Sequence, residues 1–252
     1  MRHVSRREFL IAGAAAAVLV ACSDDNGSDT TDTSTTATST TVPANRPSGQ
    51  PSTTSLTAAD FDGLAVCALT PEQTAGPFPL EEQFVRRDIT EGFDGHAVLL
   101  GFRVVDADCT PVPGAAVEVW HTDATGDYSA FADGGGGKDE AEGTTFMRGT
   151  QVAGDDGIVE FATVYPGWYP GRAPHIHLRV HRDDEVVLTS QVYFDEDYSE
   201  QVYTEAPYDE FGVPDTSWDD DGIAGDPTAD GTALFLTQTN PGTRALLNLG
   251  VA

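Results

Sequence analysis

A series of short, apolar-alternating segments separated by glycine and proline turns constrains the fold more than any other feature of this chain. Turn residues stand at 111–114, 155–157 and 166–167, and no long helical periodicity occurs between them. Segments rich in Val, Leu or Phe predict strands over residues 97–105, 115–122, 157–162, 175–181, 186–194 and 233–236. Strands at such intervals predict an all-β fold, an antiparallel β-sandwich that forms a single domain.

Two long loops interrupt this pattern. Residues 132–145 include four consecutive glycines, and residues 195–230 are acidic and contain Tyr and Pro. Loops of that length in a compact domain are usually functional or mobile. Within the second loop, residues 219–222 (Asp-Asp-Asp-Gly) suggest calcium, but they lack the ligand spacing of a calcium loop. We therefore expect a solvated acidic turn there.

The N-terminal segment predicts export. Residues 5–10 (Ser-Arg-Arg-Glu-Phe-Leu) form a twin-arginine signature, and the apolar run that follows at 11–20 is too short to span a bilayer of about 30 Å. Residues 1–21 are predicted to be a signal peptide of the lipoprotein type with Cys22 as the lipidated residue, although ordinary cleavage stays open. Residues 22–55, mostly Ser, Thr, Asp, Pro, Gly and Ala, predict a disordered tether before a folded domain at 56–252. The expected location is the cell surface, with membrane contact only through the lipid.

The net charge of the chain limits the classes of partner that it can bind. The formal net charge is -28, with 41 acidic and 13 basic residues, which argues against nucleic-acid binding because that needs basic patches. We interpret the acidity as a source of solubility or salt tolerance. With Cys22 lipidated, Cys67 and Cys109 are left as one pair in an oxidising compartment, and we predict a disulfide between them; two buried thiols are the alternative.

Two histidines and two tyrosines form a candidate metal set. On the strand predicted at 175–181, His175 and His177 project from the same face. Tyr169 precedes them closely and Tyr128 lies further upstream. Phenolate oxygen is a hard anionic donor that favours ferric iron, while imidazole suits iron, zinc or copper. A zinc or copper protein built on the His-x-His pair is therefore one alternative.

The segment 111–128 taken alone has a structural interpretation. Its strand–Pro-Val-Pro-Gly-Ala–strand arrangement, closed by a tyrosine, is shared by prealbumin-like sandwich modules that have no catalytic activity. In such modules the tyrosine only packs. A non-catalytic, surface-anchored binding module of prealbumin type is thus a second alternative, and only the coincidence of Tyr128 with the other candidate ligands argues against it.

Three blocks together resemble the intradiol ring-cleavage dioxygenases, the family of catechol and protocatechuate dioxygenases. The blocks are residues 70–78, 117–128 and 146–177, and the last is the most specific. The resemblance implies a prealbumin-like β-sandwich and an Fe(3+) ion bound by Tyr128, Tyr169, His175 and His177. Its activity would be cleavage of an ortho-diphenol by O2 to a muconate-type dicarboxylate. Arg172 would stabilise negative charge on the ring, Gln191 would lie beside the bound diol, and Tyr169 would leave the metal when the diol binds. Tyr169 lies only six residues before His175, a spacing shorter than in protocatechuate dioxygenases.

Overall fold

The computed structural model describes residues 55–64, 68–131 and 143–252, all within one compact unit, Asn45–Ala252. The predicted signal peptide, nearly all of the predicted tether, Cys22, Cys67 and most of the 132–145 loop lie outside the described residues. In these three ranges, no helix combines the length and the apolar character needed to cross a membrane.

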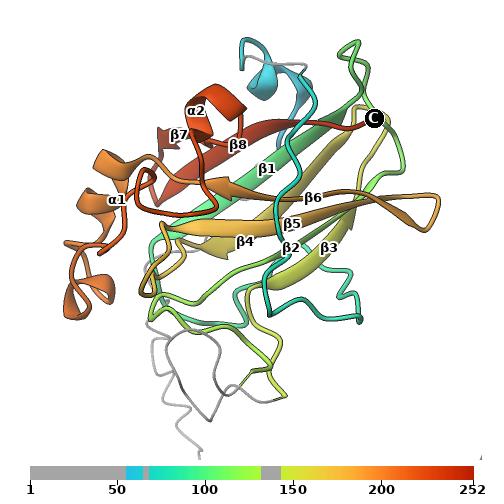
Figure 1. The fold of residues 1–252 in the computed structure, drawn as a ribbon. Coiled ribbons are helices and arrows are strands. Elements are labelled where there is room, and N and C mark those ends of the chain that lie inside the picture. Colours follow the sequence, from blue (N-terminus) through green and yellow to red (C-terminus); the bar gives the residue numbers. More distant parts are fainter. Residues whose placement is uncertain (1–54, 65–67, 132–142) are drawn as a thin grey trace, which may run out of the picture. The chain divides into compact units, whose positions relative to one another are not determined.

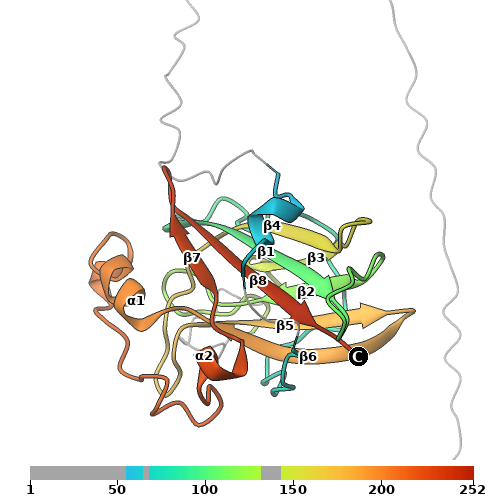
Figure 2. The same cartoon turned by 90° about the horizontal axis from the view of Figure 1, so that it is seen from above.

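The described residues form two four-stranded sheets (Figure 1; Figure 2). The first sheet has the order β4-β1-β8-β7, made of Ile158–Val164, Ala97–Val105, Thr243–Gly250 and Phe235–Gln238. The second has the order β3-β2-β5-β6, made of Arg148–Val152, Ala116–Trp120, His175–Arg182 and Glu185–Tyr193. The helical segments of the described residues are short: 3-10 turns at Ala58–Phe61 and Tyr208–Glu210, α1 at Glu196–Val202 and α2 at Pro227–Asp230. The prediction of an all-β fold is confirmed.

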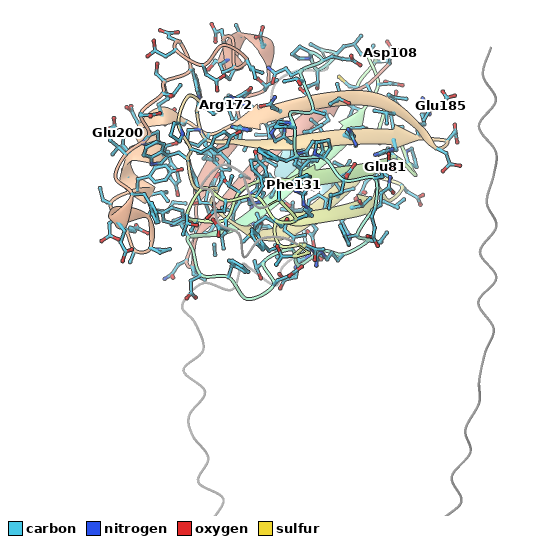
Figure 3. All side chains as sticks on the ribbon, turned by 60° about the horizontal axis from the view of Figure 1, so that its bottom comes forward. Glu81, Asp108, Phe131, Arg172, Glu185 and Glu200 are labelled. Atoms are coloured by element: carbon cyan, nitrogen blue, oxygen red, sulfur yellow. The ribbon has the colours of Figure 1, made fainter. Side chains whose placement is uncertain are left out.

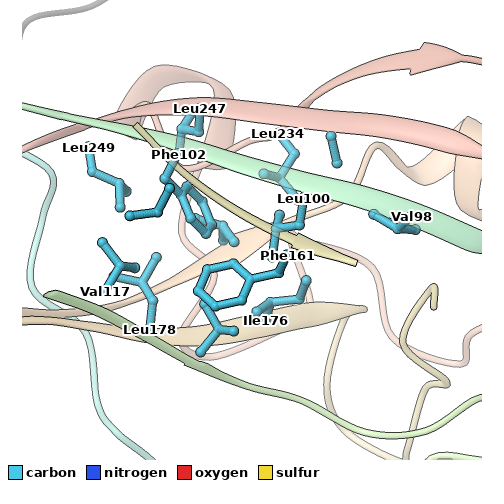
Figure 4. Packing of buried hydrophobic residues seen from close by; sticks show 14 of the residues in the cluster. Val98, Leu100, Phe102, Val117, Phe161, Ile176, Leu178, Leu234, Leu247 and Leu249 are labelled. Atoms are coloured by element: carbon cyan, nitrogen blue, oxygen red, sulfur yellow. The ribbon is translucent and has the colours of Figure 1, made fainter. Parts of the chain in front are cut away.

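The main hydrophobic core draws its side chains from both sheets. Figure 4 shows Leu100, Phe102 and Leu247 of the first sheet facing residues of the second. Those partners include Val117 of β2 and Leu178 of β5, and every one of these five side chains is at most 2% exposed. Burying one such side chain fully contributes about 1.5–3 kcal/mol, so the contact between the sheets is the main source of stability in this domain.

The predicted strands correspond to β1, β2, β4, β5, β6 and β7 with shifts at their ends, but β3 and β8 were missed. In addition, the pairing is not purely antiparallel as predicted, because β1 and β8 pair in parallel. Parallel neighbours need a long crossover connection, and here the whole second sheet lies between them in sequence. The 195–230 loop also contains structure: the Asp195 side chain caps α1 by accepting the Tyr198 N–H, and Asp226 caps α2.

Strand β5 separates the core from the candidate site. Its residues Ile176, Leu178 and Val180 are fully buried in the core, as the period of two requires. His175 and His177 therefore project from the opposite face of the second sheet, and that face carries the site.

Of the predicted disulfide, the structure describes one member. Cys109 is disulfide-bonded, while Cys67 lies outside the described residues.

Candidate metal centre

A row of polar and aromatic side chains crosses the outer face of the second sheet. The register pairs Arg148 of β3 with Trp120 of β2, Trp120 with His177 of β5, and His177 with Gln191 of β6. The Trp120 and His177 rings stack 5.1 Å apart at an interplanar angle of 2°. All four side chains are buried although they face away from the core, since loops cover this face. The sheet thus fixes His177 from both sides.

Tyr128 is carried by a turn that follows β2. The Asp123 carboxylate accepts the backbone N–H groups of Thr125 (2.8 Å) and Asp127 (3.1 Å), the local bonding that Asp favours in turns. The Asp123 carbonyl accepts the N–H of Gly126 at 3.2 Å. This short, internally bonded turn reverses the chain and directs the fully buried Tyr128 ring back over the sheet.

Tyr169 and Arg172 are the two ends of one tight turn. The Arg172 N–H donates to the Tyr169 carbonyl across Pro170 and Gly171, and Gly171 has a φ of +82°. Proline followed by glycine at positive φ is the sequence that a type II turn requires. Because the turn is tight, a phenol and a guanidinium three residues apart lie side by side next to β5.

The two tyrosine-bearing loops pack against each other at Gly126. A Cβ atom on Gly126 would lie 2.4 Å from the Trp168 carbonyl oxygen, and the Gly126 φ is +88°. The Gly167 N–H donates to the Asp123 carbonyl at 2.7 Å, and the Thr122 hydroxyl donates to the Gly167 carbonyl at 2.6 Å. The position of Tyr128 relative to Tyr169 is therefore set by backbone contact.

Four donor atoms converge at this place. The His175 Nε2 lies 3.3 Å from the Tyr128 Oη, 3.2 Å from the Tyr169 Oη and 3.2 Å from the His177 Nε2, and the two phenol oxygens are 3.5 Å apart. Ligands about 2.1 Å from one ion and arranged tetrahedrally are about 3.4 Å from one another. The His175 Nδ1 donates to the Ala173 carbonyl at 2.6 Å, which leaves the Nε2 lone pair free for a ligand. Both the spacing and the chemistry of this donor set fit a metal ion.

Burial keeps these four side chains uncharged in the absence of a cation. Loss of solvation, and then the nearby Arg172, lower the pKa of His175 to about 3, and burial lowers the pKa of His177 well below its usual 6.5. Burial also raises the pKa of both phenols, Tyr128 and Tyr169. Two neutral imidazoles are ready to donate lone pairs, and a bound cation would favour the phenolate form of both tyrosines.

A fixed positive charge lies beside the donor atoms. The Arg172 Nη1 is 3.3 Å from the His175 Nε2, and its Nη2 donates to the Gln191 Oε1. Its Nε bonds both carboxylate oxygens of Asp221, at 3.0 and 3.1 Å. Burial alone would lower the pKa of Arg172, but Tyr169 and Asp221 raise it, so the guanidinium stays charged. In Figure 3 Arg172 lies between the exposed Glu200 at one end of the domain and the exposed Glu185 at the other.

The expectation of a solvated acidic turn at 219–222 is wrong for one of its residues. The Asp221 carboxylate has no exposed surface and accepts the backbone N–H groups of Ala173, Ile223 and Ala224 besides Arg172. Four hydrogen-bond donors offset the cost of burying this charge. Asp219 and Asp220, by contrast, are exposed as expected.

The segment 73–78 covers the donor set from a third side. The Gln191 side-chain amide donates to the Thr74 carbonyl at 2.9 Å, and the Tyr193 hydroxyl donates to the Gln73 Oε1 at 2.9 Å. Phe78 stacks on Tyr128 with ring centroids 4.6 Å apart, and it also contacts Phe131. These aromatic rings give the site an apolar wall next to the polar donors.

The structure brings all six predicted site residues together: Tyr128, Tyr169, Arg172, His175, His177 and Gln191. Sequence reasoning missed Asp221, Trp120 and Phe78. Of these, Trp120 lies within the strand predicted at 115–122 and Phe78 closes the block at 70–78, whereas nothing in the sequence indicated that Asp221 is buried. Among the described residues, no group of three or more His, Cys, Asp or Glu could hold a metal, so a site here requires the tyrosines. Tyr165 is fully buried in the core, and its hydroxyl is hydrogen-bonded to the Ser199 hydroxyl at 2.9 Å.

Comparisons with known proteins show which family this chain resembles. A family model described as dioxygenase matches residues 71–204. The catechol 1,2-dioxygenase of Pseudomonas sp. (strain EST1001) is 30% identical in an alignment 146 residues long that covers 49% of this chain and 46% of that protein. The catechol 1,2-dioxygenase of Acinetobacter baylyi is 29% identical in an alignment 158 residues long that covers 53% of this chain and 49% of that protein. The chain spans about half the length of the curated relatives it matches.

Solved structures extend the likeness over the described domain. An intradiol ring-cleavage dioxygenase from Tetranychus urticae aligns with a TM-score of 0.67 at 33% identity, covering 73% of this chain and 94% of that one. The dioxygenase domain of a carbohydrate-binding fusion protein from Streptomyces sp. SirexAA-E aligns at 0.54 and 23% identity, covering 73% of this chain and 97% of that one; this shows a shared fold. The family model matches more than half of this chain, and a third of the residues aligned with the Tetranychus urticae enzyme are identical. This chain therefore belongs to the intradiol ring-cleavage dioxygenase family.

Proposed function

We propose that this protein is an iron(III)-dependent dioxygenase that cleaves an ortho-diphenol between its two hydroxylated carbons. The observation that carries the proposal is the convergence of two phenol oxygens and two imidazole nitrogens: the His175 Nε2 lies within 3.3 Å of the other three donors, and Arg172 lies beside them. Two hard anionic oxygens with two nitrogens favour a trivalent iron over zinc or copper. The relatives named catechol 1,2-dioxygenase support an ortho-diphenol as the substrate class.

When bound, Fe(III) would draw electron density from the diphenolate and so make its ring reactive toward O2. Tyr128, His175 and His177 are fully buried or nearly so, and we assign them as the permanent ligands. Tyr169 is only half-buried, and its turn lies at the surface, so it is the ligand that can give way to substrate. Its phenolate oxygen can then accept a proton from a diol hydroxyl.

Arg172 and Gln191 orient the substrate and stabilise its charge. The guanidinium Nη1 already points at the donor set, where negative charge on a diphenolate ring would lie. Gln191 fixes the other end of the guanidinium and is itself tied to the Thr74 carbonyl. The stacked Phe78 and Tyr128 rings offer the aromatic substrate a flat apolar surface that excludes water.

The test is the visible spectrum of the purified protein after addition of ferric iron, before and after anaerobic catechol. We expect an absorption band from tyrosinate bound to iron(III) that shifts when catechol binds. Admitting O2 should then consume one O2 per catechol and give one muconate, whose two new oxygen atoms both come from the added dioxygen when this is isotopically labelled. A protein that stays colourless, or that retains only zinc or copper after metal analysis, would contradict the proposal.

We also propose that the domain is a prealbumin-type sandwich, and that the chain is exported by the twin-arginine route and anchored by lipid on Cys22. The signature at 5–10 and the small residue before Cys22 support this location. Expression in a bacterium with an alkyne-tagged fatty acid should label the protein, and Cys22→Ser should abolish the label. Labelling that persists in the Cys22→Ser variant would refute the anchor.

A further inference from the structure

Asp221 is a buried acidic residue in contact with the candidate site, and its side chain has no exposed surface. Its two oxygens are used differently. The Oδ1 accepts the N–H groups of Ile223 and Ala224 and so closes the turn in which Asp221 lies. The Oδ2 accepts the Ala173 N–H at 2.9 Å, and both oxygens face the Arg172 Nε. One carboxylate thus joins the 221–224 turn to the segment that carries Arg172, 49 residues away.

The contact with Asp221 determines how the guanidinium of Arg172 is turned. An arginine side chain is a rigid planar fork, so fixing its Nε fixes the directions of both Nη groups. With the Nε on Asp221, the Nη2 meets Gln191 and the Nη1 points at the His175 Nε2. Without a carboxylate at this place, a side chain that is 14% exposed could turn toward the acidic surface residues outside the site.

The same carboxylate also acts on the backbone beside the ligands. Ala173 donates its N–H to Asp221 and accepts the His175 Nδ1–H through its carbonyl. Asp221 is thus one contact away from both Arg172 and His175. An effect on Arg172 would change turnover, whereas an effect on His175 would change metal retention, and the two effects can be measured separately.

We propose that Asp221 is a positioning residue, which holds the Arg172 guanidinium with its Nη1 directed at the bound diphenol. This inference rests on the proposed dioxygenase function. Asp221 touches neither the donor atoms nor the place that a substrate would occupy; it acts through Arg172. Gln191 holds the fork from the other side, so Asp221 and Gln191 together leave one orientation.

The experiment compares Asp221→Asn with Asp219→Asn, a matched control that removes the same charge from an exposed side chain two residues earlier in the chain. For each iron-loaded protein we would measure iron content, anaerobic catechol affinity, kcat and KM. We expect Asp221→Asn to retain its iron and its catechol affinity and to lose about tenfold to a hundredfold in kcat, since it weakens a charge-assisted contact. Asp219→Asn should match the wild-type protein.

A double variant separates positioning from a general structural role. If Asp221 acts through Arg172, then adding Asp221→Asn to Arg172→Gln should cost nothing further in kcat, because the group it positions is already gone. Losses that multiply would overturn the proposal. So would an Asp221→Asn protein as active as the Asp219→Asn control, or one whose kcat falls only in proportion to lost iron, since that would place the effect at His175.

A second measurement needs no variant and covers the case in which Asp221→Asn does not fold. In a crystal structure of the iron-loaded wild-type protein with catechol bound anaerobically, the Arg172 Nε should remain on Asp221 while the Nη1 faces the catechol. A guanidinium that has left Asp221 to reach the catechol would overturn the inference. Failure of the proposed function itself would be evident earlier, as a wild-type protein that neither binds iron nor cleaves catechol.

Discussion

The candidate site has two halves that are built in different ways. The sheet half consists of Trp120, His175, His177 and Gln191, whose positions follow from strand register on β2, β5 and β6. The loop half consists of Tyr128, Tyr169, Arg172 and Asp221, which are held by side-chain bonds to backbone and by close backbone packing. A sheet places side chains through a repeating pattern, whereas each loop needs its own contacts. The sheet half should therefore tolerate change around it, and the loop half should not.

The largest effect is expected from removing a ligand of the sheet half. His175→Ala removes the nitrogen that lies within 3.3 Å of the other three donors, while the strand itself is held by its neighbours on both sides. We expect a folded protein that loses its iron and at least about a thousandfold of its activity. Metal analysis and oxygen uptake measure both.

His181→Ala is the matched control for this ligand, since His181 lies on the same strand and face but contacts Glu118 and Gln83. It should keep its iron. If His175→Ala also kept all of its bound iron, the donor set described for this site would be wrong.

In the loop half, the two tyrosines should differ in their effects. Phenylalanine keeps each ring and removes only the oxygen, so packing such as the Phe78–Tyr128 stack is retained. Tyr128→Phe, at a fully buried position, should lose most of the bound iron, and Tyr169→Phe, at a half-buried one, should retain a substantial part but bind catechol more slowly. Iron stoichiometry and anaerobic stopped-flow absorbance would show the difference. Equal iron loss in the two variants would remove the distinction between a permanent and a replaceable ligand.

The two halves also differ in how far the sequence predicts them. The alternation of β5 placed His175 and His177 on one face, and β1 was predicted with its observed ends. Strand β3 was missed because Arg148, Gly149 and Thr150 show no apolar alternation; covering segments bury them. Strand β8 was missed because Ala-Leu-Leu between Arg244 and Asn248 suits a helix as well as a strand.

The loop half could not be derived from local pattern. Tyr128 and Tyr169 entered the candidate set by residue type alone, and only the family resemblance tied them to the two histidines, because no periodicity relates residues 41 positions apart in two different turns. Asp221 had no support from the family resemblance, and a run of three aspartates before a glycine predicts an exposed turn. Its burial depends on Arg172 and on the Ala173 N–H, both distant in sequence. Contacts of this kind become visible only in three dimensions.

Substitutions of Gly126 and Gly171 test the packing of the loops that carry Tyr128 and Tyr169. Gly126 and Gly171 have similar φ values of +88° and +82°, but a Cβ would meet the Trp168 carbonyl at Gly126 and open space at Gly171. Gly171→Ala should cost about 1–2 kcal/mol in unfolding free energy from φ alone. Gly126→Ala adds a backbone clash and should cost at least about 2 kcal/mol more, with loss of iron, because the loops must move apart. Urea unfolding compares them, and equal costs would mean that the contact between the loops is not what holds them.

An effect on stability alone, spread over several pH units, is expected at His121, where the sheet half passes into the loop half. His121 directly follows β2; its Nδ1 donates to the Thr122 carbonyl, so its Nε2 accepts from the Thr163 hydroxyl on β4 of the other sheet. Burial lowers the pKa of His121 to about 4. Below pH 6.5 the unfolded chain therefore takes up a proton that the folded protein excludes, so stability falls as the pH drops from about 6.5 toward 4. The slope from this one residue is about 1.4 kcal/mol per pH unit.

His121→Gln keeps an acceptor for the Thr163 hydroxyl and removes the titration. Metal-free His121→Gln should be less stable than metal-free wild-type protein at pH 7 and lose stability less steeply on acidification. Identical slopes for the two proteins would mean that His121 is already protonated in the folded protein. The hydrogen bond between His121 and Thr163 would then involve a charged imidazolium instead of a neutral imidazole.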